Sequence, residues 1–113
     1  MLVSERDKSY LWDLSEACKD ILNFVRNIDS TEFEQSKLIR FAVERQILVI
    51  GEAANHISEE LILNNPQIPW RKIIALRNII AHEYGEILVE RIWLTATIHI
   101  PELLDNINLL VKD

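Results

Sequence analysis

The chain has 113 residues, a formal net charge of −6, 49% hydrophobic residues and 27% charged residues. This length suits one modest core, so residues 1–113 are expected to form a single domain. The negative charge argues against binding nucleic acid by bulk electrostatics, because phosphate contacts need clustered Lys and Arg, although a small basic site remains compatible with it. Only two glycines and three prolines occur, which predicts few turns and long helices.

Several features indicate a cytoplasmic protein. Residues 1–7 become charged almost at once and lack the apolar region of a signal peptide. The apolar run Ile47–Ile50 is far too short to cross a membrane. A lone cysteine, Cys18, excludes an internal disulfide and suits a reducing compartment. We therefore expect no membrane association.

The first helix is predicted from about Glu5 to Asn27, with Ser4 and Asp7 placed as in a capping box. Apolar residues then recur every three or four positions, which is typical of a helix that packs in a bundle. Cys18 lies within this seam and is expected to be a small buried hydrophobe. The seam consists of Leu11, Leu14, Cys18, Ile21, Val25 and Ile28.

Residues 29–31 interrupt the pattern, and a second helix is predicted from about Ser36 to Leu63. Its middle, Ile47–Ile50, is apolar on every side, so it must be covered on every side. The small residues 51, 53 and 54 would let another helix approach closely. We favour a homodimer, in which a second copy of the chain covers the outer face of this helix. The alternative is that both faces are buried within one subunit.

Residues 64–69 are polar and proline-rich and predict a loop, followed by a third helix over Trp70–His82. Gly85 fits just beyond its end. A fourth helix is expected over Ile87–Val111, and Pro101 should kink or split it near Thr97 or Ile98. The four patterns predict an all-α, antiparallel up-and-down bundle of four to five helices.

The residues that carry chemistry lie together in residues 77–84, which read R-N-I-I-A-H-E-Y. Arg77 offers a planar fork of donors that matches phosphate, and His82 can take and give protons near neutral pH. Together they suit metal-independent cleavage of RNA, with Arg77 stabilising the charged transition state. Arg71 and Lys72 could add phosphate contacts. An ion pair and a helix cap are the structural alternative.

The spacing of these residues sets a geometric condition. Asn78 and His82 are four apart and share a helix face, whereas Arg77 and His82 would lie about 140° apart on an ideal helix. Arg77 and His82 converge only if the helix ends or distorts near His82, or if two helix ends meet across a dimer axis.

The pattern R-N-x-x-A-H-x-Y resembles the signature of HEPN domains, in the form typical of the HepT branch (DUF86) with its additional Tyr. Further segments resemble the same family in the same order. They are residues 41–45 (FAVER), 50–54 (IGEAA), 68–71 (IPWR), 92–93 (IW) and 100–103 (IPEL). The resemblance covers nearly the whole chain, and departs from the family pattern at the short segment 85–88 and at His99.

The resemblance implies a dimeric ribonuclease toxin of a type VII-like toxin–antitoxin system, with Arg77 and His82 as catalytic residues and Asn78 in support. Tyr84 is similar to the residue that a partner minimal nucleotidyltransferase antitoxin modifies with AMP. A phosphodiester two residues from His82 would block the site by charge and bulk. No cofactor is expected.

Other interpretations remain beside this one. The chain could be a non-catalytic helical subunit that binds a nucleotidyltransferase or a nucleotide, which the net charge favours slightly, or a purely structural dimerisation domain. Glu52 and His56 share a helix face, but a di-iron bundle needs Glu-x-x-His on two helices. No metal site is therefore predicted, and both residues are taken as polar decoration, with Glu52 also able to line the cleft.

Overall fold

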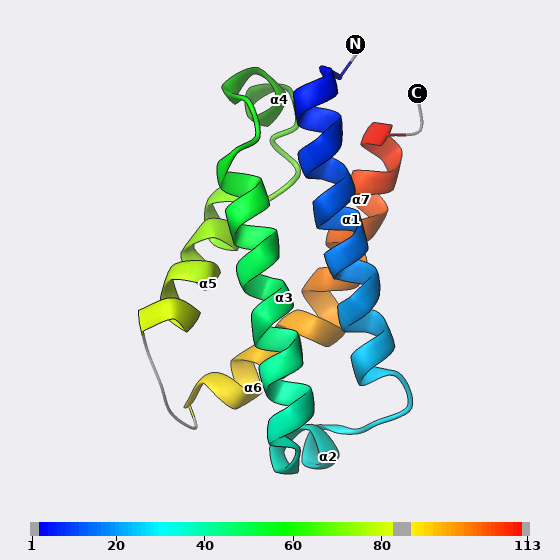
Figure 1. Ribbon diagram of the computed structural model, residues 1–113, viewed down its shortest axis with the longest axis vertical. Helices are drawn as coiled ribbons and strands as arrows, with labels where there is room; N and C mark the ends of the chain where they lie inside the picture. Colours follow the sequence, from blue (N-terminus) through cyan, green and yellow to red (C-terminus); the bar gives the residue numbers. More distant parts are fainter. Residues whose placement is uncertain (1–2, 83–86, 112–113) are drawn as a thin grey trace.

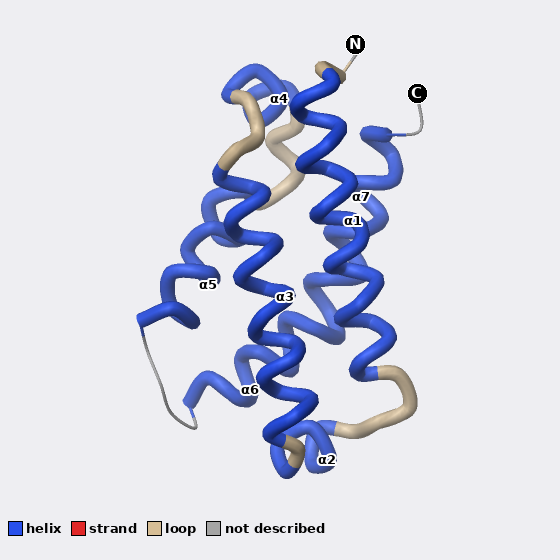
Figure 2. The backbone as a smooth tube through the Cα atoms, viewed as in Figure 1, coloured by secondary structure: helices blue, strands red, loops and turns tan. Residues whose placement is uncertain are grey.

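The computed structural model describes residues 3–82 and 87–111, which fold into helices and short connections (Figures 1 and 2). The elements in chain order are α1 (Glu5–Val25), α2 (Ser30–Gln35), α3 (Lys37–Asn55), α4 (Glu59–Asn64), α5 (Trp70–His82), α6 (Ile87–Leu94), the π-helix η1 (Thr95–His99) and α7 (Ile100–Val111). No strand occurs among the described residues, so the predicted all-α class is confirmed.

The long helices run alternately up and down the long axis of the molecule (Figure 1). Helix α1 packs against α3 on one side and α7 on the other, and α5 packs against the far side of α3. The short helices α2 and α4 lie at opposite ends, where the chain reverses direction (Figure 1). This arrangement is the antiparallel bundle predicted from the sequence.

The seam of α1 forms the centre of the core, as its spacing predicted. Leu11, Leu14, Cys18 and Ile21 are fully buried, and they meet buried residues of α3 and α7. Burial raises the pKa of the Cys18 thiol from its ordinary value of 9.0 to about 12. Cys18 therefore stays a protonated, apolar thiol at neutral pH.

The predicted second helix is wrong at its C-terminal part. Helix α3 ends at Asn55, and α4 begins only at Glu59, because Ser58 has an extended backbone and its Oγ accepts the Leu61 N–H at 3.2 Å. The buried Asp7 of α1 holds this break, accepting from the Ser58 N–H at 2.9 Å and from its hydroxyl at 2.5 Å. A side chain 51 residues away thus decides where this helix stops.

The other helix ends differ in smaller ways. Helix α1 stops at Val25 rather than Asn27, because Arg26 has an extended backbone with ψ of 131°, and Asn27 then has a left-handed backbone with φ of 64°. Where residues 29–31 interrupt the helical pattern, a separate short helix α2 begins, since Asp29 accepts the Glu32 N–H at 2.8 Å and caps α2.

The last helix is divided by η1, in the region where Pro101 predicted a break. Pro101 has no N–H to donate to Thr97, four residues earlier. The Ile100 N–H bonds to the Thr95 carbonyl, five residues back, which is the π pattern. The hydroxyl of Thr97 also donates to the Trp93 carbonyl at 2.8 Å. The kink at Pro101 itself stays a prediction.

The apolar middle of α3 is covered largely within the chain. Ile47 and Ile50 are buried, whereas Leu48 and Val49 remain half-buried on the outer side.

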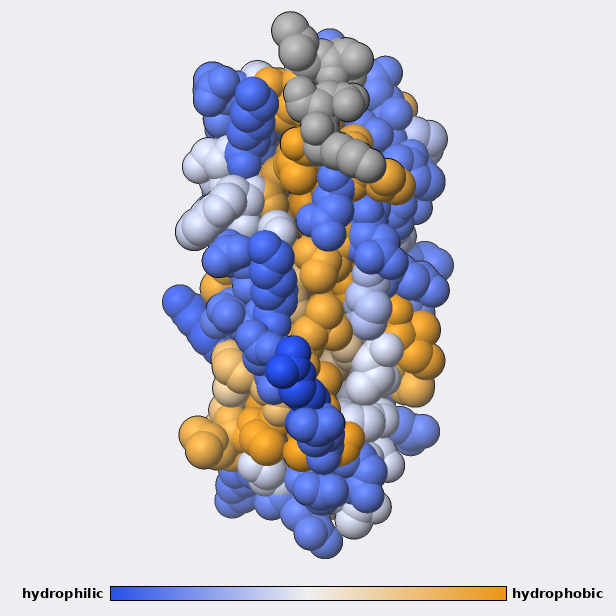
Figure 3. All heavy atoms as spheres, turned by 90° about the vertical axis from the view of Figure 1, so that its right-hand side faces the viewer, coloured by the Kyte–Doolittle hydropathy of each residue, from blue (hydrophilic) through white to orange (hydrophobic). Residues whose placement is uncertain are grey.

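No helix in the described part of the chain is long and apolar enough to span a lipid bilayer. An apolar strip does run along the side formed by α1 and α7, between polar flanks (Figure 3).

Candidate functional site

The candidate site begins where α5 lies close against α3. Gly51 of α3 faces Arg77 of α5, and a β-carbon at Gly51 would overlap the Cβ of Arg77. The missing side chain at Gly51 lets the aliphatic part of Arg77 lie directly on the α3 backbone. The guanidinium is therefore directed along the surface of α3 rather than into open solvent.

Two acceptors hold this guanidinium. The Nη2 group of Arg77 donates to Glu52 Oε2 at 2.6 Å, in an ion pair between α5 and α3. The Nη1 group donates to the side-chain oxygen of Asn78 at 3.0 Å. Arg77 has five N–H donors, so donors remain for a third partner such as a phosphate oxygen. The Arg77 side chain is 34% exposed, which leaves it within reach of a ligand.

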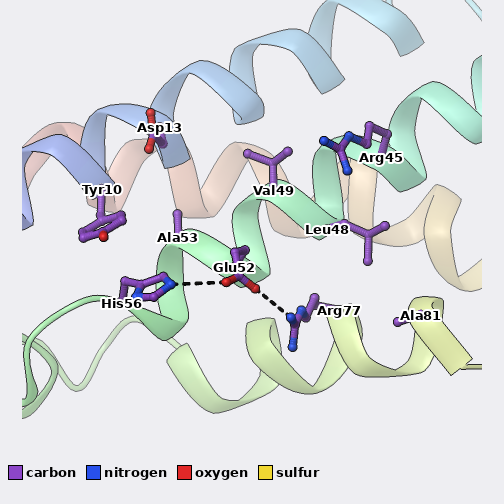
Figure 4. A pocket seen from close by; sticks show the side chains of 10 residues that line it. All are labelled: Tyr10, Asp13, Arg45, Leu48, Val49, Glu52, Ala53, His56, Arg77 and Ala81. Atoms are coloured by element: carbon purple, nitrogen blue, oxygen red, sulfur yellow. Dashed lines mark hydrogen bonds and ion pairs between the residues drawn. The ribbon is translucent and has the colours of Figure 1, made fainter.

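Arg77 lines an open cleft of about 390 Å³ that runs along the outer side of α3 (Figure 4). Helix α1 forms one wall of this cleft and α5 forms the other. The floor consists mainly of α3 residues spaced three or four apart, because that spacing keeps them on one face. The lining is Tyr10, Asp13, Arg45, Leu48, Val49, Glu52, Ala53, His56, Arg77 and Ala81.

One end of the cleft is aromatic. The rings of Tyr10 and His56 stack with centroids 5.1 Å apart and planes 13° apart. His56 Nε2 lies 3.2 Å from Glu52 Oε1, so the Glu52 carboxylate bridges His56 and Arg77 (Figure 4). Arg45 and Ala81 lie toward the other end (Figure 4). The cleft thus joins a cation, a carboxylate and a stacked aromatic pair.

His82 does not belong to the lining of the cleft that Arg77 lines, and the assignment of Arg77 and His82 as one catalytic pair stays a prediction. Helix α5 continues regularly to His82, which is exposed. Helix α5 ends at His82, as the condition for convergence requires, but His82 does not reach the cleft lining within one chain. Arg71 and Lys72 are exposed in the first turn of α5 and also lie outside the cleft lining. Tyr84 falls outside the described residues.

The sequence predicts little of this lining. It assigns Glu52 and His56 as polar decoration, with Glu52 also able to line the cleft, and it gives no role in the site to Tyr10, Asp13 or Arg45. The available signal was the spacing of residues 45, 52 and 56, which places them on one helix face. Among the described residues, no group of three or more His, Cys, Asp or Glu could hold a metal ion.

The fold and the site together define an all-helical protein that presents a fixed arginine in an open cleft. A family model described as "Ribonuclease HepT-like" matches residues 14–110. The chain therefore belongs to the HepT-like ribonuclease family. No solved structure gives a significant match.

Relatives from two organisms agree with this assignment. A protein of Methanocaldococcus jannaschii, named as a candidate RNase, is 35% identical over 102 residues, covering 89% of this chain and 94% of that protein. A second protein of that organism, with the same description, is 34% identical over 106 residues, covering 94% and 88%. A Thermococcus cleftensis protein, named probable ribonuclease HepT, is 36% identical over 96 residues, covering 85% and 87%.

Proposed function

We propose that this protein is a metal-independent endoribonuclease in which Arg77 and His82 act on an RNA phosphodiester. The observation that carries the proposal is the guanidinium of Arg77, held in an open cleft by Glu52 and Asn78 with donors left for phosphate. Membership of a ribonuclease family supports the same reading. Arg77 would bind the scissile phosphate and stabilise the negative charge that builds up on it.

His82 would transfer the proton in this reaction. It takes the proton of the attacking 2′-hydroxyl or gives one to the departing oxygen, which are the two acid–base tasks of RNA cleavage. Asn78 supports the site by accepting from Arg77, and it shares a helix face with His82. Arg71 and Lys72, exposed one to two turns upstream, add phosphate contacts outside the cleft.

The active form is proposed to be a homodimer. His82 does not line the cleft of its own chain, so a second copy can supply the missing group at the Ala81 end. Leu48 and Val49, half-buried on the outer side of α3, are apolar surface that such a copy would cover. The test is to mix inactive Arg77→Ala and His82→Ala proteins under subunit exchange. Shared sites restore part of the cleavage, whereas sites within one chain restore none.

The decisive experiment measures RNA cleavage by the wild type, Arg77→Ala and His82→Ala proteins, with and without EDTA. Each substitution should lower the rate at least about 100-fold, as loss of a transition-state donor does elsewhere. Arg91→Ala removes an exposed arginine of α6 and should cleave like the wild type. Full activity of either single variant would refute the assignment, and loss of activity in EDTA would refute the metal-independent mechanism.

The biological role is proposed to be that of a cytoplasmic toxin silenced by a minimal nucleotidyltransferase. That partner would transfer AMP from ATP to the Tyr84 oxygen, releasing pyrophosphate and the phenolic proton. Tyr84 follows His82 by two residues, so the added phosphodiester would repel the substrate phosphate. Mass spectrometry after incubation with the partner and ATP should show one added AMP on the wild type and none on Tyr84→Phe.

A second function has its own support. The net charge of −6 and the separation of His82 from the Arg77 cleft fit a non-catalytic subunit that binds a nucleotidyltransferase or a nucleotide. Growth and RNA integrity decide between the two when the protein is expressed without an antitoxin. Growth arrest with cut RNA, abolished by His82→Ala, supports the ribonuclease. Normal growth with intact RNA supports the binding subunit.

A further inference from the structure

We propose that the aromatic end of the cleft is a nucleobase subsite, in which a base of the RNA strand packs against the Tyr10–His56 pair while an adjoining phosphate contacts Arg77. This inference rests on the proposed function for the identity of its ligand, because RNA supplies both groups on one chain. The subsite itself is assigned from geometry and from the chemistry of its lining.

The aromatic pair is held in place before any ligand arrives. Tyr10 stacks on His56, and the guanidinium carbon of Arg6 lies 6.0 Å from the Tyr10 ring centroid. His56 is fixed at its Nε2 by Glu52 at 3.2 Å, yet 42% of its side chain remains exposed. A base that stacks on such a pair loses little free energy to ordering the protein, which is the advantage of a preorganised site.

The position of the pair relative to Arg77 suits one short stretch of RNA. A single carboxylate, that of Glu52, contacts both His56 and Arg77, so the two subsites are separated by little more than one side chain (Figure 4). A nucleotide carries its base and its phosphate on one ribose, and can therefore reach both at once. The cleft volume of about 390 Å³ lies within the range of small-molecule sites.

The remaining polar groups match RNA as well. Asp13 and Arg45 line the cleft, and neither has a hydrogen bond or ion pair within the described residues. The Asp13 carboxylate can accept from a ribose hydroxyl or a base N–H, and Arg45 can take a second phosphate. Aromatic stacking combined with cations that contact the backbone is the usual way in which proteins hold single-stranded RNA.

The test measures binding to two strands of equal length by fluorescence anisotropy. One is a labelled single-stranded RNA dodecamer, and the other is a labelled dodecamer of abasic sugar-phosphate units. All proteins carry His82→Ala so that the RNA stays intact. Tyr10→Ala should weaken RNA binding roughly 5- to 100-fold, in line with the loss of one base–aromatic stack, and leave binding of the abasic strand unchanged. Arg77→Ala should weaken binding of both strands.

Two further variants control this result. Tyr10→Phe keeps the ring and should bind RNA like its parent. Trp12→Ala removes an aromatic side chain of the same helix that is 63% exposed and lies outside the cleft, and should also bind like its parent. The subsite is refuted if Tyr10→Ala weakens both strands equally, weakens neither, or has the same effect as Trp12→Ala.

A second measurement does not depend on how Tyr10→Ala folds. In the NMR spectrum of the His82→Ala protein, the ring protons of Tyr10 and His56 should shift when RNA is added and stay in place with the abasic strand. Absence of a shift with RNA at saturation would also refute the subsite. A free mononucleotide should shift the same rings at matched occupancy, because it carries the same base and phosphate.

The two proposals fail separately. If the wild type cuts no RNA but binds it through the aromatic pair, the ribonuclease assignment is wrong and the nucleobase subsite stands. If the wild type cuts RNA and Tyr10→Ala leaves binding unchanged, the ribonuclease assignment stands and the subsite is wrong.

Discussion

Gly51 and Arg77 are packed so closely that a β-carbon on Gly51 would overlap the Cβ of Arg77 and lie 2.6 Å from its Cγ. The obstacle is the base of the arginine side chain rather than its flexible end, so relief requires α5 to move relative to α3. Glu52, the next residue of α3, then receives the guanidinium at 2.6 Å. Gly51 therefore positions the Cβ and Cγ atoms of Arg77, and Glu52 positions its guanidinium.

Gly51→Ala tests this contact because two effects oppose each other. Alanine in a helix interior stabilises a protein by about 0.5–1 kcal/mol relative to glycine. Overlap in a tightly packed contact costs about 1–3 kcal/mol. We expect the overlap to dominate, so that denaturant unfolding shows a less stable protein and RNA cleavage falls with it. A variant more stable than the wild type and fully active would contradict the observed packing.

Glu52 is expected to act as a positioning residue for Arg77. Because the Glu52 side chain is 52% exposed, Glu52→Ala should change the free energy of unfolding by less than about 1 kcal/mol. The released arginine should lower kcat about 10- to 100-fold with little rise in KM, since small misplacement of a catalytic group is costly. Glu52→Gln keeps an acceptor oxygen and should retain more activity.

A matched control for Glu52 is Glu60→Ala, which removes one exposed carboxylate from α4, outside the cleft. It should leave kcat unchanged. Steady-state cleavage of one RNA substrate measures all three variants. An unchanged kcat in Glu52→Ala would show that Arg77 needs no support from Glu52.

Ser58 is expected to matter more for stability than an ordinary helix cap. Ser58→Ala removes the cap of α4 and one of the two hydrogen bonds to the buried Asp7, at a cost of about 2–3 kcal/mol. Ser36→Ala removes only the cap of α3, which bonds to the Ile39 N–H, and should cost about 1 kcal/mol. Urea unfolding compares the two, and equal losses would show that the hydrogen bond from the Ser58 hydroxyl to Asp7 adds no stability.

The raised pKa of the buried Cys18 thiol predicts that the free energy of unfolding falls at alkaline pH. Its folded pKa of about 12 exceeds its ordinary value of 9.0, so the unfolded chain releases the thiol proton first as the pH rises. Below about pH 9 the thiol is protonated in both states, and the free energy of unfolding is unaffected. Between about pH 9 and pH 12 the free energy of unfolding falls by about 1.4 kcal/mol per pH unit, because only the unfolded chain has lost the proton. Unfolding at pH 8 and pH 10.5 should show this extra fall in the wild type and not in Cys18→Ala. Parallel losses in the two proteins would exclude Cys18 as the cause.

Local rules determined much of this fold from the sequence. The three- and four-residue spacing of the α1 seam predicted its burial, because a helix places such residues on one face. Trp70–His82 was predicted with the bounds that the structure shows, since Pro69 suits the first turn of a helix. The segment η1 lies just before Pro101, whereas the kink expected at Pro101 itself stays a prediction. Family membership likewise followed from residues 77–84, whose order needs no tertiary structure to be read.

The tertiary structure decided what depends on contacts between distant parts of the chain. The stop after α3 requires Asp7 to meet Ser58, and no window of sequence around Ser58 contains that partner. The position of Arg77 depends on the packing of α5 against Gly51 and Glu52 of α3. The aromatic end of the cleft depends on the stacking of Tyr10 on His56. Periodicity assigns residues to a face of one helix, but only packing decides which helix that face meets. The sequence therefore identified Arg77 as a site residue, and the packing of α1, α3 and α5 determined which residues surround it.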